Sequence, residues 1–278
     1  MEIGIVAWPV DQGVGICELV RAAEDARLES LFIVERTHVP TSRRDVVDDD
    51  LHKMDAHLLD PFTALGAAAA VTSRIKLGTG ICVAVQHDPI ILAKQVVTID
   101  YLSGGRFLFG VGVGWLIEEM TNHGVDPPRR WELLREQVLA MKTIWTEDEA
   151  AFHGEFVNFD PIWLWPKPVQ RPHPPVLVGA DGPHALERVV DYGDGWMPVV
   201  TTDFPLEPRL TELDRLCAEV GRDRVPVTAA LTDIDEELIQ RCAELGVTRC
   251  VVVAPTGDLA IVQPFLDRCS EIATRLHG

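Results

Sequence analysis

The chain alternates between two kinds of apolar pattern from one end to the other. The first is a short continuous run rich in valine and isoleucine, which is typical of strands buried on both faces of a parallel sheet. The second is a longer stretch with apolar residues every three or four positions, which predicts an amphipathic helix. The first pattern predicts eight strands, at residues 3–8, 30–35, 75–82, 106–114, 175–180, 195–200, 226–232 and 249–255.

A helix is predicted after each strand, and some of these helices carry start signals. Asp60 and Asp88 each precede a proline, which places an N-cap side chain before the residue type preferred at the first helical position. In the first helix, Ile16, Leu19 and Val20 fall on one face. The predicted helices are residues 16–29, 60–72, 88–101, 131–147, 183–193, 205–220, 233–245 and 257–276.

Eight strand–helix units in 278 residues favour an α/β fold, a closed (β/α)8 TIM barrel, over an open doubly wound sheet. We expect a single domain over residues 1–278, because no linker or low-complexity segment interrupts the alternation. Residues 148–174 contain several prolines and two short apolar runs. They predict an irregular insertion between the fourth and fifth strands.

The composition excludes several classes of partner. The formal net charge is −18 and no basic stripe offsets it, so we expect neither nucleic acid nor an anionic membrane as a partner. No run approaches the ~18 apolar residues of a membrane span, and the N-terminus lacks the basic start of a signal peptide. We therefore expect a cytoplasmic protein. The six cysteines form no CxxC motif, which predicts buried, reduced thiols.

The fourth predicted strand ends in Gly110, Gly112 and Gly114, directly before Trp115. A dinucleotide-binding loop would follow the first strand and read GxGxxG, so this spacing does not match it. At a period of two, the three glycines point the same way, and glycines within a strand indicate a close approach. Two interpretations stay open: a flat ring packed against the strand end, or small residues needed for packing inside the barrel.

Other types of catalytic site find little support in the sequence. Residues 48–57 (DDDLHKMDAH) hold His52, Asp55 and His57, but they lie in a predicted loop and lack the HExxH spacing. We expect no metal there. The chain also has no GxSxG elbow, no P-loop and no paired Cys/His nucleophile.

A set of longer stretches carries a resemblance to a known family. The sequence resembles the luciferase-like monooxygenase superfamily, and more narrowly its actinobacterial branch of probable coenzyme F420-dependent oxidoreductases. This resemblance implies a (β/α)8 barrel with a flavin or deazaflavin at its C-terminal face, which agrees with the strand count. The stretches are ERTHVP (35–40), LDPFTALGAAAAVTSRIKLGTG (59–80), the run from LAKQ to GVGW (92–115), RWELLREQVLAMKTIWTEDEAAFHGEFVNF (130–159), WPKPVQRPHPPVLVGADGP (165–183) and YGDGWMP (192–198).

The resemblance implies that the cofactor ring lies across the barrel mouth. In similar enzymes a cis peptide bond and a bulge at the position of Gly80–Ile81 back the ring, although an ordinary strand end is the alternative. Members of the family contact the ring or the substrate at the position of Trp115. Trp8 could line an apolar pocket. The residues implied to bind the ring are Trp8, Arg36, Gly80, Ile81, Gly112, Gly114 and Trp115.

The resemblance also implies a phosphate site after the fifth strand. Backbone N–H groups at a helix N-terminus bind phosphate, and the family places its cofactor phosphate there. Asp181 could equally serve only as an N-cap, and a plain loop is the alternative for the whole segment. The residues concerned are Gly179, Ala180, Asp181 and Gly182, with Gly195 and Trp196 beside the same tail.

The segment ERTHVP departs from the family's usual EHTHIP at Arg36. Arginine stays protonated near neutral pH and is a poor general base. Arg36 could stabilise an anionic reduced cofactor or pair with Glu35. His38 is then the nearest group that titrates near pH 7, unless it only bonds the loop backbone. Glu118 is a candidate acid or base, or simply a favourable charge in a first helical turn.

Taken together, the resemblance implies an F420-dependent oxidoreductase that moves a hydride between the deazaflavin C5 and a small organic substrate. We expect a homodimer, with Arg36, Arg43 or Arg44 near the cofactor's ring or acidic tail. The first alternative is an FMN-dependent monooxygenase supplied by a separate reductase. The second is a barrel that binds a cofactor without turnover, and the third is a metal-dependent hydrolase. Neither the substrate nor the direction of transfer follows from the sequence.

Overall fold

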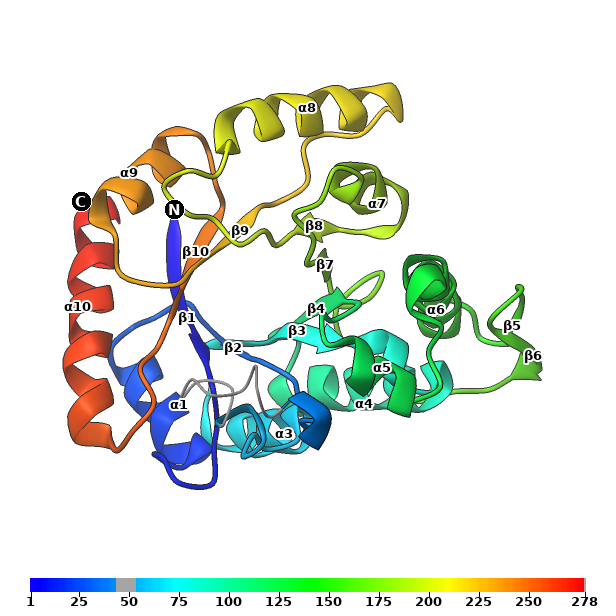
Figure 1. Ribbon diagram of the computed structural model, residues 1–278, viewed down its shortest axis with the longest axis horizontal. Coiled ribbons are helices and arrows are strands. Elements are labelled where there is room, and N and C mark those ends of the chain that lie inside the picture. Colours follow the sequence, from blue (N-terminus) through cyan, green and yellow to red (C-terminus); the bar gives the residue numbers. More distant parts are fainter. Residues whose placement is uncertain (44–53, 278) are drawn as a thin grey trace.

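Eight parallel strands form the centre of the molecule in a computed structural model that describes residues 1–43 and 54–277 (Figure 1). Their order in the sheet is β8-β7-β4-β3-β2-β1-β10-β9. Parallel bridges Trp196–Val227 and Val199–Ala230 join the two outer strands and close the predicted barrel. The strands are β1 (Glu2–Ala7), β2 (Ser30–Ile33), β3 (Lys76–Val83), β4 (Phe107–Gly112), β7 (Val176–Val178), β8 (Gly195–Trp196), β9 (Thr228–Leu231) and β10 (Arg249–Val253).

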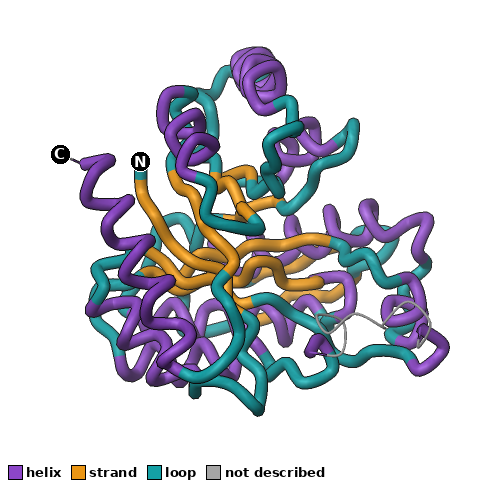
Figure 2. The backbone as a smooth tube through the Cα atoms, turned by 60° about the vertical axis from the view of Figure 1, so that its left-hand side comes forward, coloured by secondary structure: helices purple, strands orange, loops and turns teal. Residues whose placement is uncertain are grey.

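Helices surround the strands on the outside (Figure 2). Every helix predicted from the sequence is confirmed, with bounds that shift by only a few residues. The caps of two helices explain their start points, because Asp60 accepts the Thr63 N–H at 2.7 Å and Asp88 accepts the Ile91 N–H at 2.9 Å. These helices are α1 (Ile16–Asp25), α3 (Pro61–Val71), α4 (Pro89–Ser103), α6 (Arg130–Thr146), α7 (Ala185–Tyr192), α8 (Leu206–Glu219), α9 (Glu236–Glu244) and α10 (Leu259–His277).

The insertion is more ordered than predicted. A hairpin of β5 (Ala150–His153) and β6 (Asn158–Ile162) projects beside α6 (Figure 1), so the expectation of an irregular segment was wrong over this part. The Glu136 carboxylate in α6 holds the hairpin turn by accepting backbone N–H groups, for example that of Phe156 at 2.7 Å. Short elements outside the predicted set are α5 (Ile117–Asn122) and the 3-10 turns η1 (Thr41–Arg43), η2 (Ala84–Gln86) and η3 (Pro127–Arg129).

The core has two parts. The larger part lies between the outer face of the barrel and the helices. The smaller part fills the barrel interior with side chains from several strands, as barrels of this kind require. All six cysteines are free, and all except Cys17 are buried. The interior part consists of Val6, Phe32, Leu108, Leu177, Met197 and Val251.

Within the described residues, no helix combines the length and the apolar content needed to cross a lipid bilayer.

Glycine is required at the end of β4 because β3 lies very close to it. The pairing of β3 with β4 shifts register between Thr79 and Cys82, which marks a bulge. A β-carbon added at Gly110 would overlap the carbonyl oxygen of Thr79, which is a backbone atom that cannot turn away. Packing inside the barrel therefore accounts for Gly110. The expectation that all three glycines point the same way is wrong at Gly114, whose φ of +69° is left-handed.

Substituting Gly110 by alanine is expected to destabilise the protein by at least ~2 kcal/mol, because overpacking a core costs about 1–3 kcal/mol even where side chains can yield. Urea unfolding followed by circular dichroism measures this change. The matched control is Gly66→Ala in α3, where an added β-carbon meets nothing within 4 Å. The control should be neutral or stabilising by up to about 1 kcal/mol, since glycine weakens a helix interior. Equal stability of the two variants would contradict the packing explanation.

Candidate functional site

A cavity of about 420 Å³ opens at the C-terminal ends of β1 to β4. Its walls are mostly apolar, and they include Val34, Leu58 and Val83 in addition to residues named from the sequence. The volume lies within the range of about 300–1,000 Å³ that is usual for pockets binding small molecules. The sequence-predicted residues that line it are Trp8, Glu35, Arg36, Gly80, Ile81, Gly114 and Trp115.

Ile81 links this cavity to the neighbouring strands. The Gly80–Ile81 peptide bond is cis, as the resemblance implied, and it lies within the bulge of β3. A β-carbon at Gly112 would overlap the Ile81 side chain, and one at Gly179 would lie 2.7 Å from its Cγ2 atom. The two glycines therefore leave room for Ile81 between the ends of β4 and β7. Neither glycine is itself part of the cavity wall.

Arg36 is held by a network of acidic side chains at the cavity wall. Its guanidinium donates to Glu119 Oε2 at 2.5 Å and to Asp55 Oδ2 at 3.3 Å, and its side chain is only 7% exposed. The guanidinium also lies over the Trp115 ring, 5.0 Å from the centroid. Trp8 Nε1 donates to the other oxygen of Asp55 at 3.3 Å. Arg36 thus pairs with Asp55 and Glu119, and not with Glu35, which was one of the two alternatives considered from the sequence.

The Glu119 carboxylate is buried and ionised. Its other oxygen accepts the backbone N–H and the hydroxyl of Thr37, at 2.9 and 3.0 Å. Burial by itself would raise the pKa of Glu119, but the charge of Arg36 and the hydrogen bonds from Thr37 and Arg36 together lower the pKa below its ordinary value. Glu119 therefore places a negative charge beside Arg36 at neutral pH.

Glu35 faces away from Arg36, toward β3. One of its oxygens accepts the Val83 N–H at 2.5 Å, and the other lies 2.7 Å from His87 Nε2. Burial alone would lower the pKa of His87, but the hydrogen bond and charge of Glu35 raise it overall. Burial, aided by the charge of Glu35, raises the pKa of the Cys82 thiol nearby. Glu35 thus ties the end of β2 to β3.

Two candidate catalytic residues do not line the cavity. His38 Nδ1 bonds the Thr37 hydroxyl at 2.9 Å, and its Nε2 atom lies 2.9 Å from the Asn122 side-chain nitrogen. Its partners are therefore side chains, in place of the loop backbone considered above. Glu118 lies half-buried in the first turn of α5.

The predicted phosphate segment surrounds the end of β7. Ala180 is buried, whereas Asp181 and Gly182 are exposed, and an added β-carbon at Gly182 would meet nothing within 4 Å. Asp181 is not the N-cap of α7, because that position belongs to His184. Asp181 Oδ1 instead accepts the Val199 N–H at 3.1 Å, which links the loops after β7 and β8.

Gly195 and Trp196 lie beneath this segment, where both are buried. Trp196 Nε1 donates to the Ala180 carbonyl oxygen at 2.8 Å and so supports the loop from below. Arg209 in α8, which was not found from the sequence, donates to the Gly182 carbonyl oxygen at 3.0 Å. Its Nε atom is buried and has no hydrogen-bond partner among the described residues. Arg209 therefore places a cation with an unused donor beside the segment.

The described residues of the acidic segment 48–57, which we considered as a metal site, have different partners in the structure. Asp55 joins the Arg36 network, whereas His57 Nδ1 contacts Asp11 Oδ1 at 3.0 Å. His52 and Arg44 lie outside the described residues, and nothing is described of the Arg43 side chain.

Comparison with known proteins settles the family. The family model for luciferase-like monooxygenases matches residues 12–237. The chain belongs to this family. An uncharacterized protein of Mycobacterium tuberculosis strain H37Rv is 41% identical over 276 residues, which cover 96% of this chain and 97% of that protein.

Relatives with a named activity use two different cofactors. The F420-dependent glucose-6-phosphate dehydrogenase of Kineococcus radiotolerans is 32% identical over 148 residues, or 52% of this chain and 43% of that enzyme. The FMNH2-dependent dimethylsulfone monooxygenase of Pseudomonas putida is 36% identical over 132 residues, or 45% of this chain and 36% of that enzyme. The luciferase-like family therefore includes F420-dependent and FMN-dependent oxidoreductases.

Several residues of the site were not found from the sequence. Asp55 and Glu119 bind Arg36 from positions 19 and 83 residues away along the chain. An arginine next to a buried strand end requires counter-charges, and the acidic pair at residues 118–119 was a usable signal for one of them. Arg209 is the fourth residue of α8, where the sequence offered no such signal.

Replacing Glu119 with glutamine should destabilise the protein by ~3 kcal/mol at pH 7, because it leaves the buried Arg36 without its closest counter-charge. The folded-state pKa of Glu119 lies below its ordinary value of 4.5, so its stabilising effect is complete above that pH. The effect disappears as the pH falls through the lower folded-state value. The difference between wild type and variant should therefore be constant from pH 7 to pH 5 and shrink below pH 4.5.

Urea unfolding at several pH values measures this difference. The control is Glu187→Gln, which changes an exposed carboxylate in α7 and should shift stability little at any pH. A Glu119→Gln penalty that stays constant down to the acid limit of folding would show that the ionised network is not its source.

Proposed function

We propose that this protein is an F420-dependent oxidoreductase that moves a hydride between the deazaflavin C5 and a small organic substrate. The observation that carries the proposal is the apolar cavity at the mouth of the barrel, which has a fixed arginine in its wall. The cofactor would supply the redox chemistry, and the protein would supply position, charge and exclusion of water.

The cavity fits a flat aromatic ring. Ile81 and Leu58 offer apolar surface, and Trp8 adds an indole. The Nε atom of Arg36 is buried without a hydrogen-bond partner among the described residues, so it leaves one donor for a ligand acceptor. Glu119 and Asp55 each accept one N–H from the two terminal nitrogens and balance the charge, so Arg36 would orient the ring more than neutralise it.

The exposed segment 179–182 would hold the phosphate of the cofactor. Gly182 leaves its backbone accessible, and Arg209 brings a positive charge to a protein that is strongly acidic overall. Gly179 contacts Ile81, so this segment adjoins the ring wall. Proton exchange with a substrate would fall to Asp55, whose side chain is 12% exposed against 2% for Glu35.

FMN is the second candidate, because the 36% identical relative in Pseudomonas putida is named for FMNH2. The same cavity and phosphate segment would hold that cofactor. The sequence resemblance to the F420 branch favours the deazaflavin.

Titration of the purified protein with F420 and, separately, with FMN should show binding of F420 at micromolar or lower concentration and much weaker binding of FMN. The reason is that the cavity is proposed to bind the deazaflavin ring and the segment 179–182 to bind the phosphate of the F420 tail. Isothermal calorimetry measures both affinities under the same conditions. Tighter binding of FMN would replace the deazaflavin proposal with the monooxygenase one, and binding of neither would contradict both.

Arg209→Ala should weaken F420 binding by roughly 10- to 100-fold, the equivalent of a lost hydrogen bond between charged groups. It should leave the binding of the phosphate-free deazariboflavin unchanged, because that compound has no group at the segment 179–182. Arg215→Ala is the control, since it removes an exposed arginine from the same helix that is paired with Glu212 and Glu219. Equal losses for both ligands would place the phosphate elsewhere.

A further inference from the structure

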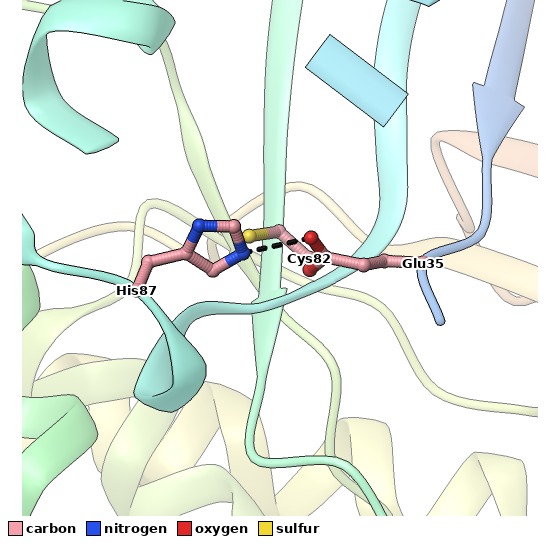
Figure 3. Close-up of side chains that lie close together, drawn as sticks. All are labelled: Glu35, Cys82 and His87. Atoms are coloured by element: carbon pink, nitrogen blue, oxygen red, sulfur yellow. Dashed lines mark hydrogen bonds and ion pairs between the residues drawn. The ribbon is translucent and has the colours of Figure 1, made fainter. Parts of the chain in front are cut away.

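Three side chains with metal-binding atoms meet behind the cavity wall (Figure 3). A carboxylate oxygen of Glu35, Cys82 Sγ and a ring nitrogen of His87 all lie within 4.8 Å of one another. They come from three segments: Glu35 follows β2, Cys82 is in β3, and His87 follows η2. This group differs from the possible ligands His52, Asp55 and His57 that lie at residues 48–57.

Glu35 and Cys82 are buried, His87 is partly buried, and hydrogen bonds hold Glu35 and His87 in place. Cys82 has no exposed surface, and the side chains of Glu35 and His87 are 2% and 17% exposed. The Val83 N–H fixes one Glu35 oxygen at 2.5 Å, so the other oxygen points to His87 Nε2 at 2.7 Å. A sulfur and a carboxylate carried on adjacent strands provide the rigid support that a metal site requires.

The charges around the group favour a cation. Glu35 and Asp60 both act on Cys82 and on His87 through their negative charge. A divalent ion would neutralise the Glu35 carboxylate together with a Cys82 thiolate, which leaves the buried group without net charge.

We propose that Glu35, Cys82 and His87 bind one Zn²⁺ ion. Thiolate, imidazole and carboxylate are the ligands that zinc takes in proteins, and three of them leave a fourth position for water. Magnesium and calcium are disfavoured, because they require oxygen ligands throughout. Binding would release the thiol proton and any proton on His87. The ion would join β2, β3 and the turn after η2 directly behind Glu35, which itself lines the cavity.

This site does not depend on the identity of the cofactor, and its test uses no cofactor. Untagged full-length protein is titrated first with Co²⁺ and then with Zn²⁺. Wild type should bind one ion per chain and show a thiolate-to-cobalt absorption band in the near ultraviolet, which zinc then removes. Zinc should also raise the thermal midpoint of unfolding, because it binds the folded state.

Cys82→Ala keeps the contact between Glu35 and His87, so the variant should fold. It should lose the cobalt band and bind zinc at least ~100-fold more weakly, since even the partners of metal ligands contribute 10–100-fold. The control is Cys217→Ala, which removes a buried thiol from α8 and should behave as wild type. Absence of the band in wild type, unchanged zinc binding in Cys82→Ala, or the same loss in Cys217→Ala would each overturn the proposal.

Discussion

The positive charge of Arg36 is almost completely shielded from water, which is unfavourable unless the charge is paired. Two carboxylates provide that pairing. Glu119 comes from the helix after β4 and Asp55 from the segment between β2 and α3, and both carboxylates converge on one guanidinium. Because an unpaired buried charge is strongly unfavourable, these segments must pack together for the barrel mouth to exist. The same pairing fixes Trp115 and Trp8, which form two sides of the cavity.

A second constraint is steric and lies on the other side of the cavity. The bulge in β3 brings backbone and the Ile81 side chain toward β4 and β7. Only glycine at positions 110, 112 and 179 avoids a collision with them. Three strands therefore meet around one isoleucine, which adjoins both the cavity and the segment proposed for phosphate. The site is thus assembled by backbone packing before any cofactor is considered.

The sequence predicted the parts of the structure that depend on local pattern. The alternation of apolar runs and amphipathic stretches defines the barrel, and Asp60 and Asp88 place two helix starts correctly. The hairpin of β5 and β6 escaped prediction, because its turn is held by a side chain of the preceding helix, Glu136, and not by a turn motif of its own. Partner choice is equally non-local: Arg36 binds acids far along the chain, although Glu35 is its neighbour in sequence.

Among the residues named from the resemblance, one group lines the cavity and another is buried beneath a loop. Those implied to bind the ring, except Gly112, line one cavity, because parallel strands bring their carboxyl ends to one face of a barrel. Gly195 and Trp196 instead turn out to be buried supports, which no pattern of residue types distinguishes from exposed ligand contacts. The reason is that burial at a strand end depends on the loops packed over it.

The central claim is that the cavity between Trp8 and Trp115 receives the ring of the cofactor. The most direct test is quenching of tryptophan fluorescence by bound F420, compared among wild type, Trp8→Phe, Trp115→Phe and Trp163→Phe. Trp163 is 79% exposed on the insertion and serves as the reference. The account predicts that quenching falls when Trp8 or Trp115 is replaced and is unchanged when Trp163 is replaced. Quenching that depends on Trp163 but not on Trp8 or Trp115 would contradict it.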